Sequence, residues 1–104
     1  MKFYHATTGA AAESILNDGV LKADAFGEVF LCRTPLDACK FVVIRGVTLV
    51  SVLEINMKRS EVYESHDHSE AFFGCKAYAH HGDITLRGNV PVLTYDFREL
   101  MKEV

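Results

Sequence analysis

The stretch Phe3-Tyr4-His5-Ala6-Thr7-Thr8, which runs into the alanine-rich segment Gly9 to Gly19, decides the architecture predicted for this chain. Its two aromatic residues favour a strand. The Thr-Thr-Gly that follows interrupts the strand pattern, and the alanine-rich segment predicts a helix that ends where Gly19 can take the left-handed cap at no steric cost. His5 is therefore expected at the end of a short strand, beside a helix N-terminus whose amides and dipole can hold an anion or a polar ligand. We predict the functional site here.

The composition predicts one soluble globular domain that spans residues 1–104. Of the 104 residues, 49% are hydrophobic and 24% are charged, and this length accommodates one domain of ordinary size. The net charge of −3 gives no reason to expect long-range attraction to nucleic acid or anionic membranes, although it leaves a local basic patch open. The N-terminus lacks the pattern of a signal peptide, and no apolar run approaches the ~20 residues that span a bilayer. We therefore predict a cytoplasmic protein without membrane association.

The three cysteines agree with a reduced, intracellular protein. Cys32, Cys39 and Cys75 are odd in number and far apart, and no C-x-x-C pair occurs. This spacing indicates neither a disulfide framework nor a zinc ribbon. Because Cys32 and Cys39 fall in segments expected to be buried, we predict that both act as small hydrophobic residues.

The order of the remaining elements predicts the α+β class. Glu28 to Cys32 is expected to form a short buried strand, and Thr34-Pro35 begins a second helix, with Thr34 as N-cap, that stops near Arg45-Gly46. Val47 to Met57 has apolar residues on both faces, which favours a central strand. Shorter strands are predicted at 61–64, 76–80, 84–86 and 90–94, and a short C-terminal helix is predicted from an N-cap at Asp96 through Lys102. Helices cluster early and strands late, as in α+β proteins.

Four segments together resemble the ADP-ribosyltransferase superfamily. They are a strand carrying Tyr4-His5-x-Thr7, a helix ending in Ile15-Leu16-x-x-Gly19-Val20-Leu21, the segment Gly27 to Cys32, and a helix carrying Pro35, Ala38 and Phe41. The superfamily includes poly(ADP-ribose) polymerase-like and DNA-modifying toxin enzymes and the RNA 2′-phosphotransferases. The likeness lies mainly in residues 3–41 and loosens after Met57. It implies a split, mixed or antiparallel β-sheet core that binds NAD, as a substrate, in a cleft between its halves.

The resemblance also implies roles for individual residues. His5 matches the first-strand histidine that hydrogen-bonds a ribose hydroxyl of NAD, and Thr7 matches the small polar residue whose backbone fixes the nicotinamide side. Phe30 and Phe41 fall where the family has two tyrosines, the second of which stacks on the nicotinamide ring. Phenylalanine keeps the stacking face but loses the hydroxyl.

The acidic residue of the family has no clear equivalent in the sequence. These enzymes commonly carry a glutamate near the start of a late strand, where it stabilises the positive charge that develops as nicotinamide leaves. No Glu-x-Glu or Gln-x-Glu occurs here, and the catalytic candidates are Asp83, preferred on position, and Glu70. Loss of the acid would be expected of a binding-only member or of a phosphotransferase-like one. The latter would need arginines, and those available are Arg33, Arg45, Arg59 and Arg87.

Histidines form a second group of candidates. His66-Asp67-His68 and His80-His81-Gly82-Asp83 contain the imidazoles and carboxylates that bind zinc, nickel or copper. No closed four-ligand spacing emerges, so we assign no metal ligands and expect solvated loop histidines. If His80 or His81 faces the cleft of His5, either could aid substrate binding or proton transfer.

Three functions remain open. The first is an enzyme that binds NAD and transfers ADP-ribose to a macromolecular acceptor, either protein or nucleic acid. The second is a module on the same fold that binds a nucleotide, a nucleic acid or a protein without catalysis. The third and weakest is a histidine-based metal protein. At this length a partner copy that completes the cleft, as in a homo-oligomer, is also open.

Overall fold

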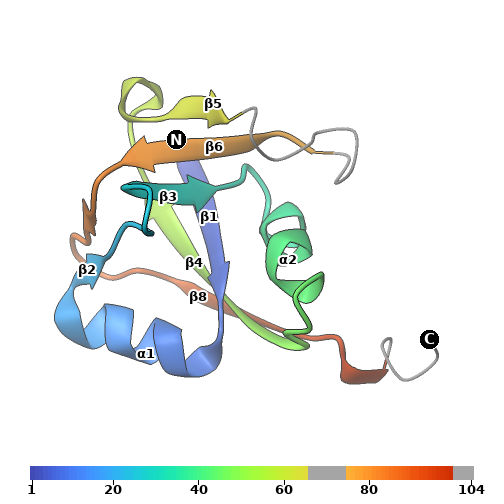
Figure 1. The fold of residues 1–104 in the computed structure, drawn as a ribbon. Coiled ribbons are helices and arrows are strands. Elements are labelled where there is room, and N and C mark those ends of the chain that lie inside the picture. The colour runs from blue at the N-terminus through green and yellow to red at the C-terminus, as the bar shows by residue number, and fades with distance from the viewer. Residues whose placement is uncertain (66–74, 100–104) are drawn as a thin grey trace.

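The computed structural model describes residues 1–65 and 75–99 (Figure 1). In chain order the elements are β1 (Lys2–Thr7), α1 (Gly9–Asp18), β2 (Val20–Leu21), β3 (Glu28–Leu31), α2 (Pro35–Val43), β4 (Leu49–Asn56), the 3-10 turn η1 (Arg59–Glu61), β5 (Tyr63–Ser65), β6 (Ala77–His81), β7 (Ile84–Thr85) and β8 (Val92–Asp96). The predicted α+β class is confirmed.

The strands form a split antiparallel sheet. One half has the order β1-β4-β8 and the other β3-β6-β5, while β2 and β7 form a separate two-stranded ribbon. All pairings between the named strands are antiparallel. Within residues 1–65 and 75–99 a single bridge joins the halves, in which Tyr4 and Cys32 exchange backbone hydrogen bonds of 2.8 and 2.9 Å. Among the described residues the sheet is thus antiparallel rather than mixed.

The two helices begin and end where their sequences predict. The Thr8 side chain accepts the Ala11 N–H at the start of α1, and Gly19 closes that helix with a φ of 70°. Thr34 accepts the Asp37 N–H at the start of α2, with Pro35 in the first turn. Both N-caps satisfy amides that the helix itself leaves without partners.

The helices cover opposite faces of the central strand β4. Alternate residues of β4 belong to two core clusters, because successive side chains of a strand point to opposite faces. The α1 cluster contains Phe3, Ala12, Leu21, Val29, Leu31, Leu53, Ile55, Met57, Val62 and Ile84. The α2 cluster contains Cys32, Ala38, Cys39, Val42, Val50 and Val52. The predicted central position of this strand and the burial of Cys32 and Cys39 are both confirmed.

Some predictions lie outside the described residues. The candidate acid Glu70 and the histidines His66 and His68 fall within 66–74, and the last three residues of the predicted C-terminal helix, 100–102, fall within 100–104. At the start of that helix, the Asp96 carboxylate accepts the backbone N–H of Arg98. No helix in the described ranges is long and apolar enough to cross a bilayer.

Candidate functional site

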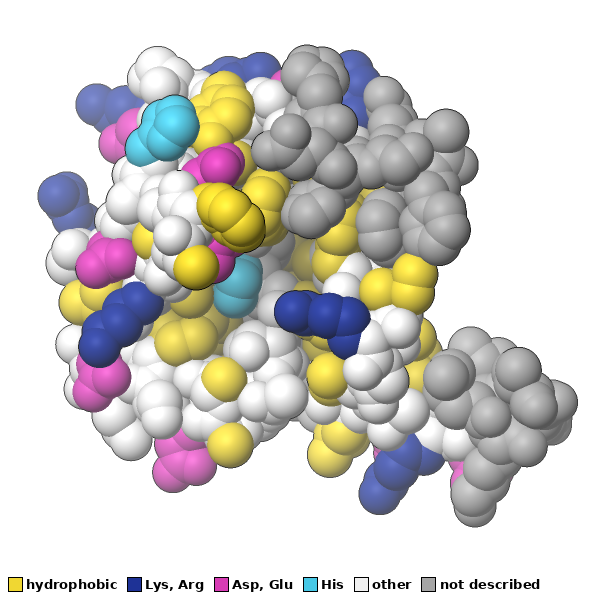
Figure 2. Space-filling view, in the orientation of Figure 1, with side chains coloured by type: hydrophobic (Ala, Val, Ile, Leu, Met, Phe, Trp, Pro, Cys, Tyr) yellow, Lys and Arg dark blue, Asp and Glu magenta, His cyan; other side chains and the backbone are white. Residues whose placement is uncertain are grey.

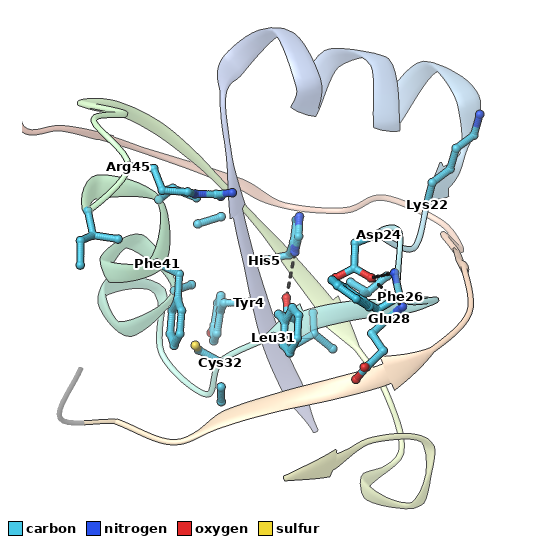
Figure 3. Close-up of a pocket in the computed structure, with 17 residues that line it drawn as sticks. Tyr4, His5, Lys22, Asp24, Phe26, Glu28, Leu31, Cys32, Phe41 and Arg45 are labelled. Carbon is cyan, nitrogen blue, oxygen red and sulfur yellow. Dashed lines mark hydrogen bonds between the residues drawn. The ribbon is translucent and has the colours of Figure 1, made fainter. Parts of the chain in front are cut away.

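A cavity of about 770 Å³ lies where the two halves of the sheet separate (Figure 3). Its walls come from β1, the loop before β3, β3 itself, and α2 with the two residues beyond its end. Its volume falls within the roughly 300–1,000 Å³ of small-molecule pockets. The lining residues with polar side-chain groups are Tyr4, His5, Lys22, Asp24, Glu28 and Arg45. Figure 2 shows a hollow on this face, where basic, acidic and hydrophobic side chains meet around a histidine.

The cavity exists because β1 and β3 pair at only one point. Continuing the antiparallel register of the Tyr4–Cys32 bridge would place Ala6 opposite Phe30, but no strand pairing between β1 and β3 is formed there. The Phe30 carbonyl is instead satisfied by a side chain, because the His5 ring nitrogen Nδ1 lies 2.9 Å from it. The imidazole therefore takes the place of a ladder hydrogen bond and keeps the strands apart.

This hydrogen bond determines the tautomer of His5. A carbonyl oxygen only accepts, so Nδ1 carries the hydrogen and Nε2 keeps its lone pair. The Nε2 atom lies on the side of the ring away from β3 (Figure 3). Burial lowers the pKa of His5; the bond to the Phe30 carbonyl acts in the opposite direction, and the charge of Arg45 lowers the pKa further. Near pH 7 the site therefore presents a neutral imidazole that can accept a hydrogen bond from a ligand hydroxyl.

Among the described residues, three of the predicted site residues line this cavity, and two, Thr7 and Asp83, do not. His5, Phe30 and Phe41 come from β1, β3 and α2, and they meet around the same space. Both phenylalanines are half-buried. Thr7 is not among the lining residues and pairs with Ser51 of β4.

Asp83 has a different place from the one expected of a catalytic acid. It is not among the residues that line the cavity. Its carboxylate accepts the backbone N–H of Ala23 at 2.7 Å and so fastens the loop before β3 to the turn between β6 and β7. The geometry gives it a structural role in that loop.

Arg45 is a cationic lining residue that the sequence motifs did not single out. It follows Phe41 by four residues, and the intervening Ile44 keeps helical dihedral angles, so both side chains lie on one face of the helix. In Figure 3 the Arg45 side chain extends toward His5. Among the residues that the structure describes, its guanidinium forms no ion pair. The spacing from Phe41 could have identified it.

Glu28 is a second lining residue that was missed. It precedes Phe30 by two residues on β3, so the two side chains lie on the same face of the strand. If Phe30 faces the cavity, Glu28 is therefore expected to face it too. The Tyr63 hydroxyl of β5 donates a hydrogen bond to Oε2 of Glu28. The Tyr63 ring in turn stacks on His81, with ring centroids 4.5 Å apart.

The loop before β3 is held by several hydrogen bonds and carries an exposed aromatic ring to the cavity. The Asp24 carboxylate accepts the N–H groups of Phe26 and Glu28 at 2.8 and 3.1 Å, and the Gly27 carbonyl accepts the Gly82 N–H at 2.7 Å. Phe26 lines the cavity yet is 88% exposed. A ring presented to solvent by this hydrogen-bonded loop is available to contact a ligand.

The remaining polar candidates lie apart from this chemistry. The Nδ1 atom of His80 is 3.0 Å from the Gly82 carbonyl in a local turn, and His81 packs on Tyr63. In the described part of the chain no group of three or more His, Cys, Asp or Glu side chains could hold a metal ion. Burial raises the pKa of Cys32, which lines the cavity, to about 12, so its thiol is a poor nucleophile.

Comparisons of the chain with protein-family models, with curated proteins and with solved structures give no match.

Proposed function

We propose that the chain binds NAD in this cavity and transfers ADP-ribose to a macromolecular acceptor. One observation carries the proposal. Of the four residues that the motif likeness assigned to NAD, three, His5, Phe30 and Phe41, come from separate elements yet line one cavity of about 770 Å³, while Thr7 is not among its lining residues. A cytoplasmic location, with which the cysteine spacing agrees, belongs to the same proposal.

The chemistry of the lining fits the parts of a dinucleotide. The neutral His5 can accept a hydrogen bond from a ribose hydroxyl through Nε2. The rings of Phe30 and Phe41 offer apolar faces for nicotinamide. The guanidinium of Arg45 suits a pyrophosphate, because its planar donors match phosphate oxygens two at a time.

The test combines ligand binding with turnover. We expect NAD at a hundred times its Kd to add about 2.7 kcal/mol to the free energy of unfolding, measured by thermal shift. We expect His5→Ala to lose this stabilisation. The control His80→Ala, which alters a histidine in a local turn, should keep it. A wild-type protein that NAD does not stabilise would contradict the proposal.

A non-catalytic nucleotide-binding module is the second candidate. It is favoured by the position of Asp83, whose carboxylate is engaged by Ala23 and is not among the cavity-lining groups. Nicotinamide release separates the two functions. A binding module would be stabilised by NAD or ADP-ribose and release no nicotinamide, whereas the transferase would release it in proportion to ADP-ribose transferred.

A further inference from the structure

Three side chains on neighbouring strands form a connected group at the β3 wall of the cavity. The strand order is β3-β6-β5, and Glu28 stands directly opposite His81 across β3 and β6. Tyr63 reaches from β5 over β6 to donate its hydroxyl hydrogen to Oε2 of Glu28, while its ring stacks on His81 at an interplanar angle of 24°. The aromatic stack limits the freedom of the Tyr63 ring, and the hydroxyl limits that of the carboxylate.

This arrangement leaves one oxygen of Glu28 for a ligand. Oε2 is occupied by Tyr63, and Oε1 accepts no hydrogen bond from any residue in the described ranges. A half-buried carboxylate that lines a cavity and has one oxygen held and one oxygen available is positioned to accept a hydrogen bond from a hydroxyl.

The other described carboxylates near the cavity are used by the fold. One oxygen of Asp24 accepts the N–H groups of Phe26 and Glu28, and Asp83 accepts that of Ala23. These three bonds maintain the loop between β2 and β3. Glu28 differs because its carboxylate accepts a hydrogen bond from a side chain, the Tyr63 hydroxyl, and not from a backbone N–H of the loop.

We propose that Glu28, oriented by Tyr63, is the catalytic acidic residue of the cavity, and that it binds a ribose hydroxyl and stabilises the positive charge formed on the ribose. This inference rests on the proposed function. The C1′–N bond breaks and its electron pair leaves on nicotinamide. A new bond forms from an acceptor oxygen or nitrogen, or from water, to C1′, and the acceptor proton passes to solvent. A carboxylate fixed beforehand near the developing charge needs no reorganisation at that moment.

The first experiment measures nicotinamide release and NAD binding by Glu28→Gln. This change keeps the shape and removes the charge, so we expect kcat to fall by about 10²–10³-fold, the loss typical of one preorganised electrostatic group, with the NAD thermal shift retained. The matched control is Glu64→Gln, because Glu64 lies next to Tyr63 on β5 but pairs with Lys76 at the surface. It should retain wild-type kcat.

The second experiment tests Tyr63 as a positioning residue. Tyr63→Phe keeps the ring that stacks on His81 and removes only the hydroxyl, so we expect kcat to fall about tenfold while KM stays unchanged. If Tyr63 had only a structural role, Tyr63→Phe would lower the melting temperature but would not lower kcat at an unchanged KM. Tyr63→Phe also tests the inference should Glu28→Gln fail to fold.

The outcomes separate this inference from the function on which it rests. A wild type that neither binds nor cleaves NAD overturns both, and one that binds without cleavage overturns the catalytic role of Glu28. An active wild type whose kcat survives both Glu28→Gln and Tyr63→Phe leaves the proposed function standing and overturns this inference alone.

Discussion

The imidazole of His5 lies in an environment that opposes its charge. Burial and the guanidinium of Arg45 lower its pKa, and the bond to the Phe30 carbonyl offsets only part of that effect. In the unfolded chain the same group takes up a proton near pH 6.5. As pH falls below that value, the unfolded state therefore binds more protons than the folded state, and the stability of the fold decreases.

This linkage predicts a pH-dependent difference between the wild type and His5→Gln. Between pH 7.5 and pH 5, urea denaturation should show a loss of unfolding free energy in the wild type that begins near pH 6.5. His5→Gln has no group to titrate at this position, so its loss over the same range should be smaller. Equal slopes for the two proteins would show that the fold does not oppose protonation of His5.

The site residues show which single-residue inferences a sequence allows. His5, Phe30 and Phe41 lie in short local patterns, and the structure brings them to one cavity. Glu28 and Arg45 follow from them by strand and helix spacing, but only once one neighbour is known to face the cavity. The prediction for Asp83 rests on its sequence separation from a later strand. That separation does not show which backbone group its carboxylate binds, which in the structure is the N–H of Ala23.

At the scale of elements, α2 carries two of the groups assigned to the ligand, Phe41 within the helix and Arg45 just beyond its end. Its N-terminus depends on Thr34, whose hydroxyl oxygen accepts the Asp37 N–H at 3.2 Å. We predict that Thr34→Ala lowers the free energy of unfolding by about 1 kcal/mol, the usual cost of a lost N-cap. Chemical denaturation measures this directly.

Ser14→Ala is the matched control for the cap, because Ser14 is an exposed residue inside α1. Alanine has the higher helix propensity, so the control should be neutral or slightly stabilising. A Thr34→Ala variant as stable as Ser14→Ala would indicate that water replaces the cap without loss.

The helices were predictable because their signals are local, whereas the pairing of strands was not. Thr8 and Gly19 bracket α1 within one short stretch, and each signal has its own physical cause. The ribbon of β2 and β7 joins Val20 and Leu21 to residues more than sixty positions later, and no pattern in either strand identifies the other. The separation of the sheet into two halves depends on such distant pairings, as does the cavity between them.

At the scale of the molecule, the two halves of the sheet are held together by packing more than by backbone hydrogen bonds. One bridge connects them in the part of the chain that the structure describes, and Phe3 of β1 packs beside it, fully buried in the α1 cluster. The centroids of its ring and the Tyr78 ring of β6 lie 5.5 Å apart in a T-shaped arrangement, and the Arg33 guanidinium lies 5.0 Å from the Phe3 centroid. A side chain on the first half therefore contacts a strand of the second, which ties the walls of the cavity to the core.

Truncation of Phe3 should consequently weaken both halves together. We predict that Phe3→Ala lowers the free energy of unfolding by about 3–5 kcal/mol, through lost burial and the void left behind, a large share of the roughly 5–15 kcal/mol typical of a domain. Phe26→Ala is the matched control, because that ring is 88% exposed and its removal should leave stability nearly unchanged. In the wild type and in Phe26→Ala, far-UV circular dichroism and tyrosine fluorescence should follow one urea transition, since both halves share the Phe3 contact. Two separated transitions in the wild type would mean that the halves unfold independently and that Phe3 does not couple them.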